Sequence, residues 1–449
     1  MKRILFLFLS ALLINCGIRA QFDALQLIDS SSKVCTGLVA ADLNMDSLQD
    51  VLITQKKFGE SFLKYYKNLG NGIFDNGDIV FRLSTAALSP NVADLNADNW
   101  PDIAFITGAS ANGRLYVMHS DQGSFSEAVL IDSGLYYAVD MKLADMDLDG
   151  APDMVVIDDT GLYVFYNEGA GNFRKTLIPA GLNTENYALS LADLDKDDYP
   201  DILVGGVRTL VYRNNAGVPV YDEQRTLSIE TGTTLILTLF STDIDGDADE
   251  DIVLLTSHRE LKIYENDGNG FFSFKEILRD NVLQCESIAA GDMDLDGDRD
   301  LVAAFPQEGR LLLFENDGNG DFSQGSTLVT GAVPFLRWTA VTDLNNDGSA
   351  DILLADDLSY MMNTRAVGVE TADPAPSFEL YPNPSDGIVH VSAAGSVRLS
   401  VISGSGRQVH RSVLSGDAVS EITLSLPSGI YLFRMEGEGF DIARKVIVR

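Results

Sequence analysis

Basic residues, histidine and cysteine are scarce in this sequence, and the first two scarcities exclude classes of function. The 449 residues include 32 Lys and Arg against 66 Asp and Glu, a formal charge of −34. A charge of that sign argues against nucleic acid and anionic membrane surfaces as partners. The four histidines, His119, His258, His390 and His410, do not cluster, and the sequence contains no HExxH, GxSxG or glycine-rich phosphate loop before a helix. No catalytic residue is therefore predicted.

Long apolar runs are also missing after the N-terminus. No later segment reaches the roughly 18 uninterrupted apolar residues of a membrane helix, so no transmembrane segment is predicted. Residues 1–20 read as a signal peptide, because Lys2 and Arg3 precede a short apolar stretch and Ala20 is a plausible cleavage point. A lipoprotein signal is the alternative, with lipidation at Cys16, although Asn15 is bulkier than the residue usually found there. We expect the mature chain to be exported and soluble.

Aspartate is abundant, and it recurs in a nine-residue pattern with Asp at position 1, Asp or Asn at 3, and Asp at 5 and 9. Seven copies begin at intervals of 52, 51, 48, 50, 49 and 51 residues. We number these segments loops 1 to 7. Their four patterned positions are Asp42, Asn44, Asp46, Asp50 (loop 1); Asp94, Asn96, Asp98, Asp102 (loop 2); Asp145, Asp147, Asp149, Asp153 (loop 3); Asp193, Asp195, Asp197, Asp201 (loop 4); Asp243, Asp245, Asp247, Asp251 (loop 5); Asp292, Asp294, Asp296, Asp300 (loop 6); and Asp343, Asn345, Asp347, Asp351 (loop 7). A near-constant period of this length indicates a repeat architecture.

Each period also carries four short β-rich runs with no helical periodicity between them, which is typical of a propeller blade. The last period stops after a third such run at residues 358–363, and the chain enters with a strand-like run at residues 22–31. The N-terminal run can therefore supply the missing fourth strand and close the ring without an open edge. The sequence predicts an all-β fold, a seven-bladed β-propeller over residues 21–364.

Together, the acidic loops and turns such as "NDGNGFF" resemble the FG-GAP and VCBS repeats of integrin-like β-propellers, over residues 22–364. The resemblance implies seven blades and calcium bound in the Asp loops. The family includes adhesins, lectin-like binders and a few lyases, so the resemblance does not fix an activity.

The chemistry of the loops favours calcium independently. Calcium takes six to eight oxygens at about 2.3–2.6 Å, and carboxylates at alternate positions of a tight loop converge on one point. In loop 3 we expect Asp145, Asp147 and Asp149 to offer side-chain oxygens, Ala151 its carbonyl, and Asp153 to close the site. Seven ions would reduce the formal charge considerably. The alternative is that the loops are acidic turns exposed to water.

Position 6 of each loop ranks the seven sites, because a sharp turn there calls for a positive φ. Glycine supplies it at Gly150, Gly297 and Gly348, so loops 3, 6 and 7 are predicted to bind calcium best. Asn and Asp tolerate that conformation, whereas Ser47 and Ala248 suit it less well, so loops 1 and 5 are predicted to be weakest.

Cysteine usage offers no redox chemistry. Cys35 and Cys285 each lie seven residues before the first Asp of their loop, in blades 1 and 6, with blade 7 between them. A disulfide needs Cα atoms within about 7 Å, so two buried thiols are expected.

Aromatic residues gather in connections on the face opposite the acidic loops, where a ligand could be held. The candidate ligand-binding residues are Phe58, Tyr136, Tyr137, Tyr187, Arg337 and Trp338. Their alternative role is to pack between blades or plug the central channel. A calcium-dependent polysaccharide lyase is the alternative function. The sequence does not identify the base and the charge-neutralising group that a lyase requires.

The C-terminal part has a different character. Residues 365–377 form a linker rich in Pro and Ala, and residues 378–449 show alternating strands suited to a small β-sandwich. "YPNP", "SGIYLFR" and "ARKVIVR" resemble the type A sorting domain of the type IX secretion system of Bacteroidetes. The resemblance implies contact with the secretion machinery and passage of the outer membrane, followed by release or surface attachment. The alternative is a permanent accessory β-domain.

The sequence therefore predicts a monomeric, secreted or cell-surface, calcium-binding propeller. We expect it to act as a binding or adhesion module for an extracellular glycan or protein.

Overall fold

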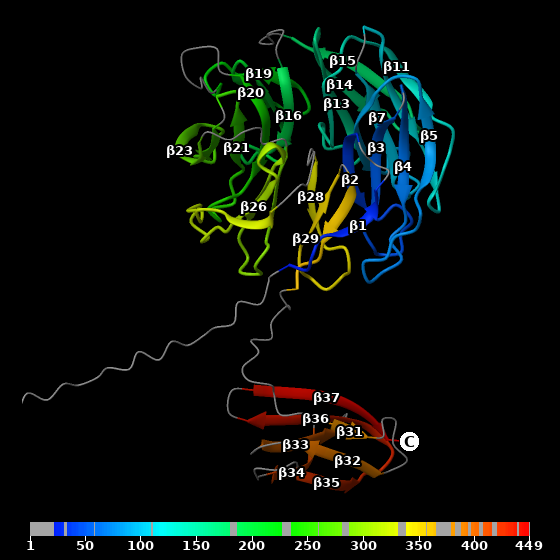
Figure 1. Ribbon diagram of the computed structural model, residues 1–449, viewed down its shortest axis with the longest axis vertical. Helices are drawn as coiled ribbons and strands as arrows, with labels where there is room; N and C mark the ends of the chain where they lie inside the picture. The colour runs from blue at the N-terminus through cyan, green and yellow to red at the C-terminus, as the bar shows by residue number, and fades with distance from the viewer. Residues whose placement is uncertain are drawn as a thin grey trace, which may run out of the picture. The chain divides into compact units, whose positions relative to one another are not determined.

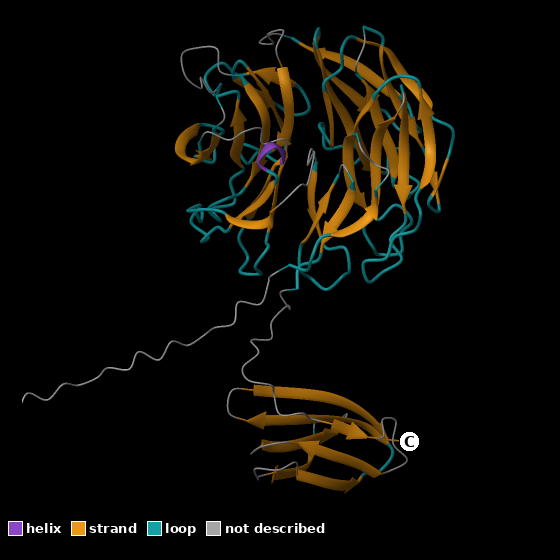
Figure 2. Cartoon of the chain, in the orientation of Figure 1, coloured by secondary structure: helices purple, strands orange, loops and turns teal. Residues whose placement is uncertain are grey.

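The structure is a computed structural model that describes residues 22–364 and 379–448, apart from gaps at 31–33, 58, 109–110, 180–185, 227–234, 259, 281–286, 331–337, 356, 382–387, 394–396, 404–406, 415–419 and 438–439. The chain divides into two compact units, Met1–Val367 and Gly368–Arg449. The described residues are almost entirely strands, turns and loops (Figure 2). Their one short helix of 3-10 type is Pro306–Glu308. No helix in the described part is long and apolar enough to cross a membrane.

Seven four-stranded antiparallel sheets make up the described part of the first unit (Figure 1). We number them by the acidic loop that each contains. Sheet 1 has β2 (Cys35–Ala41), β3 (Asp50–Lys57), β4 (Glu60–Tyr66) and β5 (Asp78–Leu83); sheet 2 has β6 (Ala87–Ala93), β7 (Asp102–Thr107), β8 (Gly113–Met118) and β11 (Val129–Leu135); sheet 3 has β12 (Asp140–Ala144), β13 (Asp153–Asp158), β14 (Gly161–Asn167) and β15 (Phe173–Ile178); sheet 4 has β16 (Asn186–Ala192), β17 (Asp201–Gly206), β18 (Thr209–Asn214) and β19 (Pro219–Tyr221).

The remaining sheets follow the same order. Sheet 5 has β20 (Ile236–Thr242), β21 (Asp251–Thr256), β22 (Leu261–Asn266) and β23 (Phe272–Arg279); sheet 6 has β24 (Ser287–Gly291), β25 (Asp300–Phe305), β26 (Arg310–Phe314) and β27 (Ser326–Thr330); sheet 7 has β28 (Thr339–Thr342), β29 (Asp351–Leu354), β30 (Leu358–Met361) and β1 (Gln26–Asp29). A small hairpin, β9 (Ser120–Asp121) and β10 (Ser124–Phe125), extends from sheet 2.

The acidic loop joins the first strand of each sheet to the second. In sheet 3, Ala144 pairs with Asp153 and Asp140 with Ile157, so the ninth loop residue begins the second strand. All residues of β13 and of its counterparts β7, β17, β21 and β25 are buried. A short continuous apolar run is what a strand covered on both faces requires. The aspartates therefore precede an apolar run because each loop delivers the chain into the buried interior of a sheet.

The N-terminal strand completes the last sheet, as the sequence predicted. β1 pairs antiparallel with β30, with Gln26 opposite Tyr360 and Leu27 opposite Ser359. In Figure 1 this dark blue strand lies with the gold strands β28 and β29. Asp29 at its end accepts hydrogen bonds from Lys64 Nζ and Tyr66 Oη of sheet 1, each at 2.6 Å. The first and last parts of this unit are thus joined by backbone and side-chain bonds.

Within the described part of the first unit, the apolar core forms seven clusters, each shared by two consecutive sheets. The cluster with Val155 and Tyr212 joins sheets 3 and 4, and the next, with Leu203 and Leu254, joins sheets 4 and 5. Further clusters join sheets 5 and 6, sheets 6 and 7, sheets 1 and 2, and sheets 2 and 3. A final cluster joins Leu353 of sheet 7 to Val51 of sheet 1, so the succession returns to its start.

The second unit contains two further sheets. One has β31 (Glu379–Tyr381), β32 (Ile388–Ala393) and β35 (Ser420–Ser425); the other has β34 (Gln408–Leu414), β33 (Val397–Ser403), β36 (Gly429–Gly437) and β37 (Phe440–Val448). Leu399, Val401 and Phe433 are fully buried in the four-stranded sheet. This unit therefore has a core of its own.

Candidate metal centres

The seven acidic loops share one backbone conformation. At position 6, φ is positive in every loop, from 65° at Ala248 to 100° at Gly297, as the sequence predicted. Position 4 has a positive φ too, which the sequence analysis missed; it is 57° at Leu148 and 77° at Gly246. Loop 5 places its glycine at position 4 instead of position 6. The predicted calcium-binding rank of loop 5 considered only position 6, where Ala248 has a φ of 65°, and not the glycine at position 4.

The first aspartate of each loop closes the turn. In loop 3, Asp145 Oδ1 accepts the N–H of Asp149 at 3.1 Å and Asp145 Oδ2 that of Gly150 at 2.8 Å. The bond from the sixth residue recurs in all seven loops. The fifth residue in turn accepts the N–H of the seventh in every loop, as Asp149 does from Ala151 at 2.9 Å. These bonds explain why the loop keeps its shape when position 6 is not glycine.

The ninth aspartate is buried in every loop. In loop 3, Asp153 Oδ2 accepts the N–H of Met146 at 2.9 Å and Oδ1 that of Asn167 at 2.7 Å. Burial nevertheless raises the pKa of this carboxyl to about 6, and that of Asp201 and Asp251 to about 7. Burial likewise raises the pKa values of Asp50, Asp300 and Asp351, each to about 6. A raised pKa means that the protein stabilises the ionised carboxylate less well than water does. A bound cation would supply the missing stabilisation.

In six of the seven described sheets, a buried asparagine at or just beyond the end of the third strand bonds the acidic loop of the preceding sheet, a link that was not predicted from the sequence. Asn167 Nδ2 donates to Leu95 O of loop 2 at 3.0 Å, and Asn214 Nδ2 to Met146 O of loop 3 at 2.7 Å. Equivalent bonds are made by Asn68, Asn266, Asn316 and Asn363. Sheet 2 has Ser120 at this position. The recurrent Asn in runs such as "LYVFYN" and "LKIYEN" is the signal that would have found it.

Loops 3, 5 and 6 bring the first, third and ninth aspartates together. In each, one carboxylate oxygen per residue lies within 4.8 Å of the others. The groups are Asp145, Asp147 and Asp153; Asp243, Asp245 and Asp251; and Asp292, Asp294 and Asp300. Asp147 Oδ1 is buried and, among the described residues, has no hydrogen-bond partner. A hard cation coordinated by oxygen fits this donor set.

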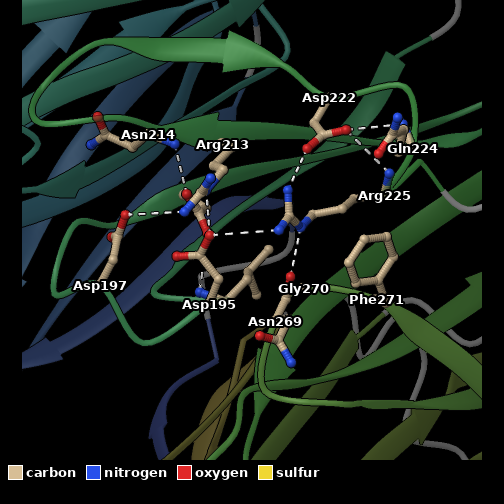
Figure 3. A network of polar contacts seen from close by, with 12 residues as sticks. Asp195, Asp197, Arg213, Asn214, Asp222, Gln224, Arg225, Asn269, Gly270 and Phe271 are labelled. Atoms are coloured by element: carbon tan, nitrogen blue, oxygen red, sulfur yellow. Dashed lines mark hydrogen bonds and ion pairs between the residues drawn. The ribbon is translucent and has the colours of Figure 1, made fainter.

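Loop 4 is assembled differently, as Figure 3 shows. Its group is Asp193, Asp195 and Asp197, without the ninth residue, Asp201. Arg213 Nε forms an ion pair with Asp195, and Arg225 Nη2 lies 3.9 Å from the same carboxylate. Sequence analysis placed all four aspartates in one site and overlooked both arginines.

Loops 1, 2 and 7 have asparagine at position 3, and its amide already bonds within the loop. Asn44 Nδ2 donates to Asp50 at 2.8 Å, Asn96 Nδ2 to Asp98 at 2.9 Å, and Asn345 Nδ2 to Asp347 at 3.0 Å. These loops carry one carboxylate fewer at the patterned positions than the others, a difference that the ranking by position 6, which placed loop 7 among the best, did not consider.

The predicted ligand residues are only partly described. Tyr136 and Tyr137 are each 43% exposed, and their rings meet edge to face with centroids 4.9 Å apart. Trp338 is also exposed. Phe58, Arg337 and the side chain of Tyr187 lie outside the described residues. Cys35 is buried, whereas Cys285 is not described.

Family comparisons agree with the repeats. The FG-GAP-like repeat matches residues 42–105, 94–156, 145–204, 243–303 and 292–354, which together span more than half of the chain. The secretion system C-terminal sorting domain matches residues 379–449. Both predicted resemblances are confirmed. The sorting domain marks the chain for type IX export, to the cell surface or into the medium.

Two curated relatives are integrins. Human integrin alpha-6 is 30% identical over 160 residues, which is 31% of this chain and 14% of the integrin. Human integrin alpha-7 is 31% identical over 142 residues, 26% of this chain and 12% of the integrin. This chain thus spans only a small part of their length. A crystal structure of BBS1N in complex with ARL6DN has a TM-score of 0.55 and 12% identity, covering 79% of this chain and 100% of that chain, and shows similarity of fold alone.

Proposed function

The chain belongs to the FG-GAP-like repeat family, and on that premise we propose that it is an exported calcium-binding β-propeller that serves as a binding or adhesion module. The proposed organisation is a signal peptide at residues 1–20, a closed ring of seven blades at 21–364, a linker at 365–377 and a removable β-sandwich sorting domain at 378–449. Support for closure comes from β1 pairing with β30 and from the core clusters that return from sheet 7 to sheet 1.

The calcium assignment depends chiefly on one observation, the buried and unbonded Oδ1 of Asp147 beside Asp145 and Asp153. Three carboxylates within 4.8 Å of one another repel strongly when ionised, and Asp147 and Asp153 both have raised pKa values for which burial is the first cause. A divalent cation would reduce that repulsion and would take Asp147 Oδ1 as one of its oxygen ligands. Bound calcium would then fix each loop at the entry of a buried strand.

Calorimetry of the mature protein tests this assignment. Saturating calcium should raise the melting temperature, and EGTA should lower it. Asp147→Asn keeps the side-chain size but removes a ligand charge, so it should reduce the calcium-induced rise. Arg82→Gln, in the outermost strand of sheet 1, is the matched control and should leave the rise unchanged. Melting that does not respond to calcium would contradict the assignment.

The proposed ligand is an extracellular glycan or protein. The exposed pair of Tyr136 and Tyr137 offers flat apolar faces next to polar hydroxyls, which suits stacking on a sugar or packing against a protein partner. Glycan and matrix-protein arrays, probed with and without calcium, would identify the class. Tyr136→Ala with Tyr137→Ala should abolish binding, whereas Phe274→Ala, which removes an exposed aromatic residue of β23, should not.

A polysaccharide lyase is the second candidate, and one contact favours it. His119 Nδ1 lies 3.0 Å from Asp102 Oδ2 and 3.3 Å from Asn96 Nδ2, which places an imidazole beside an acidic loop. A base next to a bound cation is the minimum that lyase chemistry requires. Depolymerisation of acidic polysaccharides by the wild type, lost in His119→Gln, would establish this function; its absence would leave the binding module.

A further inference from the structure

We propose that loop 4 takes no calcium ion, because the chain supplies its own cations there in Arg213 and Arg225. This inference rests on the proposed function, in which the other loops bind calcium.

Arg213 extends from a strand of sheet 4 to the aspartates of loop 4. It lies in β18 directly before Asn214, the buried residue that bonds Met146 of the preceding sheet. Its Nε forms an ion pair with Asp195, whose side chain is only 4% exposed, and its Nη2 lies 3.7 Å from Asp197 Oδ2. The strand and its buried neighbour therefore fix the guanidinium against two of the three grouped carboxylates (Figure 3).

Arg225 approaches from the opposite side, from the turn that follows β19. Besides Asp195 it contacts Asp222, donates from Nε to Asn269 O at 2.6 Å, and lies over the ring of Phe271 with 4.8 Å between the guanidinium carbon and the ring centroid. Its side chain is 15% exposed. Held by these contacts, the guanidinium is a fixed part of the site (Figure 3).

Two consequences follow for an incoming calcium ion. The ion would meet two guanidiniums of like charge near Asp195, where burial strengthens the repulsion. The arrangement of ligands also departs from that of loops 3, 5 and 6, because Asp201 is absent from the group in loop 4. Both the charge and the geometry that favour calcium elsewhere are altered here.

The positions equivalent to Arg213 and Arg225 do not carry two cations in loops 3, 5 and 6. Before the buried asparagine, loop 3 has Tyr166, loop 5 Glu265 and loop 6 Glu315. Loop 5 does have a counterpart of Arg225 in Lys275, which donates to Asn319 O at 2.8 Å, but Lys275 bonds Glu265 at 2.6 Å. Glu265 therefore balances Lys275, as Asp222 does Arg225, and loop 4 differs in having Arg213 where loop 5 has Glu265.

The junction between sheets 4 and 5 would then hold without calcium. Arg225 ties Asp195 and Asp222 of sheet 4 to the carbonyl of Asn269 in the turn between β22 and β23. In the proposed ring, the contact between sheets 4 and 5 would be stable without calcium, whereas the other contacts between sheets would depend on it.

Calcium stoichiometry tests the inference, measured on the full mature chain by equilibrium dialysis at saturating free calcium with elemental analysis. Asp195→Asn should leave the count of bound ions unchanged, whereas the matched variant Asp147→Asn in loop 3 should lower it by one. Arg213→Gln combined with Arg225→Gln should raise the count by one. Circular dichroism establishes that each variant is folded, and Arg213→Gln alone serves if the double variant is not.

The outcomes separate the two proposals. A count that falls by one in Asp195→Asn, or that does not rise when the arginines are removed, would overturn the inference while leaving the proposed function intact. A wild-type count of zero would overturn the proposed function and this inference with it.

Discussion

Loops 3 and 4 lie in neighbouring sheets that share a core cluster, and yet their aspartates have different surroundings. Both have positive φ at positions 4 and 6, and in both the first aspartate accepts the N–H of the sixth residue. Among the described residues, neither Asp147 Oδ1 nor the carboxylate oxygens of Asp195 have a hydrogen-bond partner, but Asp195 forms an ion pair with Arg213 and lies 3.9 Å from Arg225 Nη2. The two loops thus share one backbone conformation, and residues outside the loop determine which charges face its aspartates.

Removing calcium is expected to produce the largest effect and would establish which loops depend on it. A site held at ten times its dissociation constant contributes about 1.4 kcal/mol, so six such sites would contribute about 8 kcal/mol, comparable with the whole stability of a typical domain. Calorimetry with EGTA should show a large fall in melting temperature. Hydrogen exchange in EGTA should show loop 3 opening before loop 4. Equal loss of protection in the two loops would contradict the comparison.

The pH dependence should reverse when calcium is added. Burial raises the pKa values of Asp153 and Asp251 to about 6 and about 7 in the folded chain, so without calcium the folded state binds more protons than the unfolded state between about pH 4 and 7. Stability in EGTA should therefore fall as pH rises through this window. With calcium, which requires the ionised carboxylates, stability should rise with pH instead. Urea titrations at pH 4.5, 5.5 and 6.5 measure both slopes.

Removing a buried asparagine should affect sheets 3 and 4 alike, since this link does not depend on the source of the cation. Asn167→Ala leaves Leu95 O and Pro152 O without their donor, and Asn214→Ala does the same to Met146 O and Pro200 O. An unsatisfied buried group costs about 1–3 kcal/mol. Chemical denaturation should give similar losses of about 2–4 kcal/mol for the two variants. A much smaller loss in one would show that its link is redundant.

The smallest effect is expected in loop 1, where Lys67 forms an exposed ion pair with Asp46 of the loop. Lys67 Nζ lies 3.5 Å from Asp46 Oδ2, but both side chains are substantially exposed, so the pair contributes at most about 1 kcal/mol. Lys67→Met should therefore strengthen calcium binding at loop 1 by no more than about fivefold, while Lys57→Met serves as a control remote from any loop. Terbium luminescence titration would measure the change. A gain as large as that from removing Arg213 would contradict the distinction drawn from burial.

Much of the fold could be predicted because its signals are local and repeated. Seven copies of one acidic pattern, each followed by an apolar run, indicate a repeated sheet, and the lone strand at the N-terminus indicates its pairing with β30. The positive φ at position 6 was also predicted, because a single residue decides a turn. The asparagine links were missed because each bonds a carbonyl far away in the chain: Asn167 bonds Leu95, 72 residues earlier, and Asn68 bonds Leu344, 276 residues later.

The sequence by itself determined the period, the positions of the recurring aspartates and the order of the sheets, since these follow from residues near one another in the chain. Only the tertiary structure decided which aspartates meet and what faces them. Arg213 and Arg225 are 18 and 30 residues from Asp195 in the chain, and nothing in their local sequence distinguishes them from other surface arginines. Strand pairing and the turn after β19 bring both to the same buried carboxylate, because folding places residues that are distant in the chain side by side.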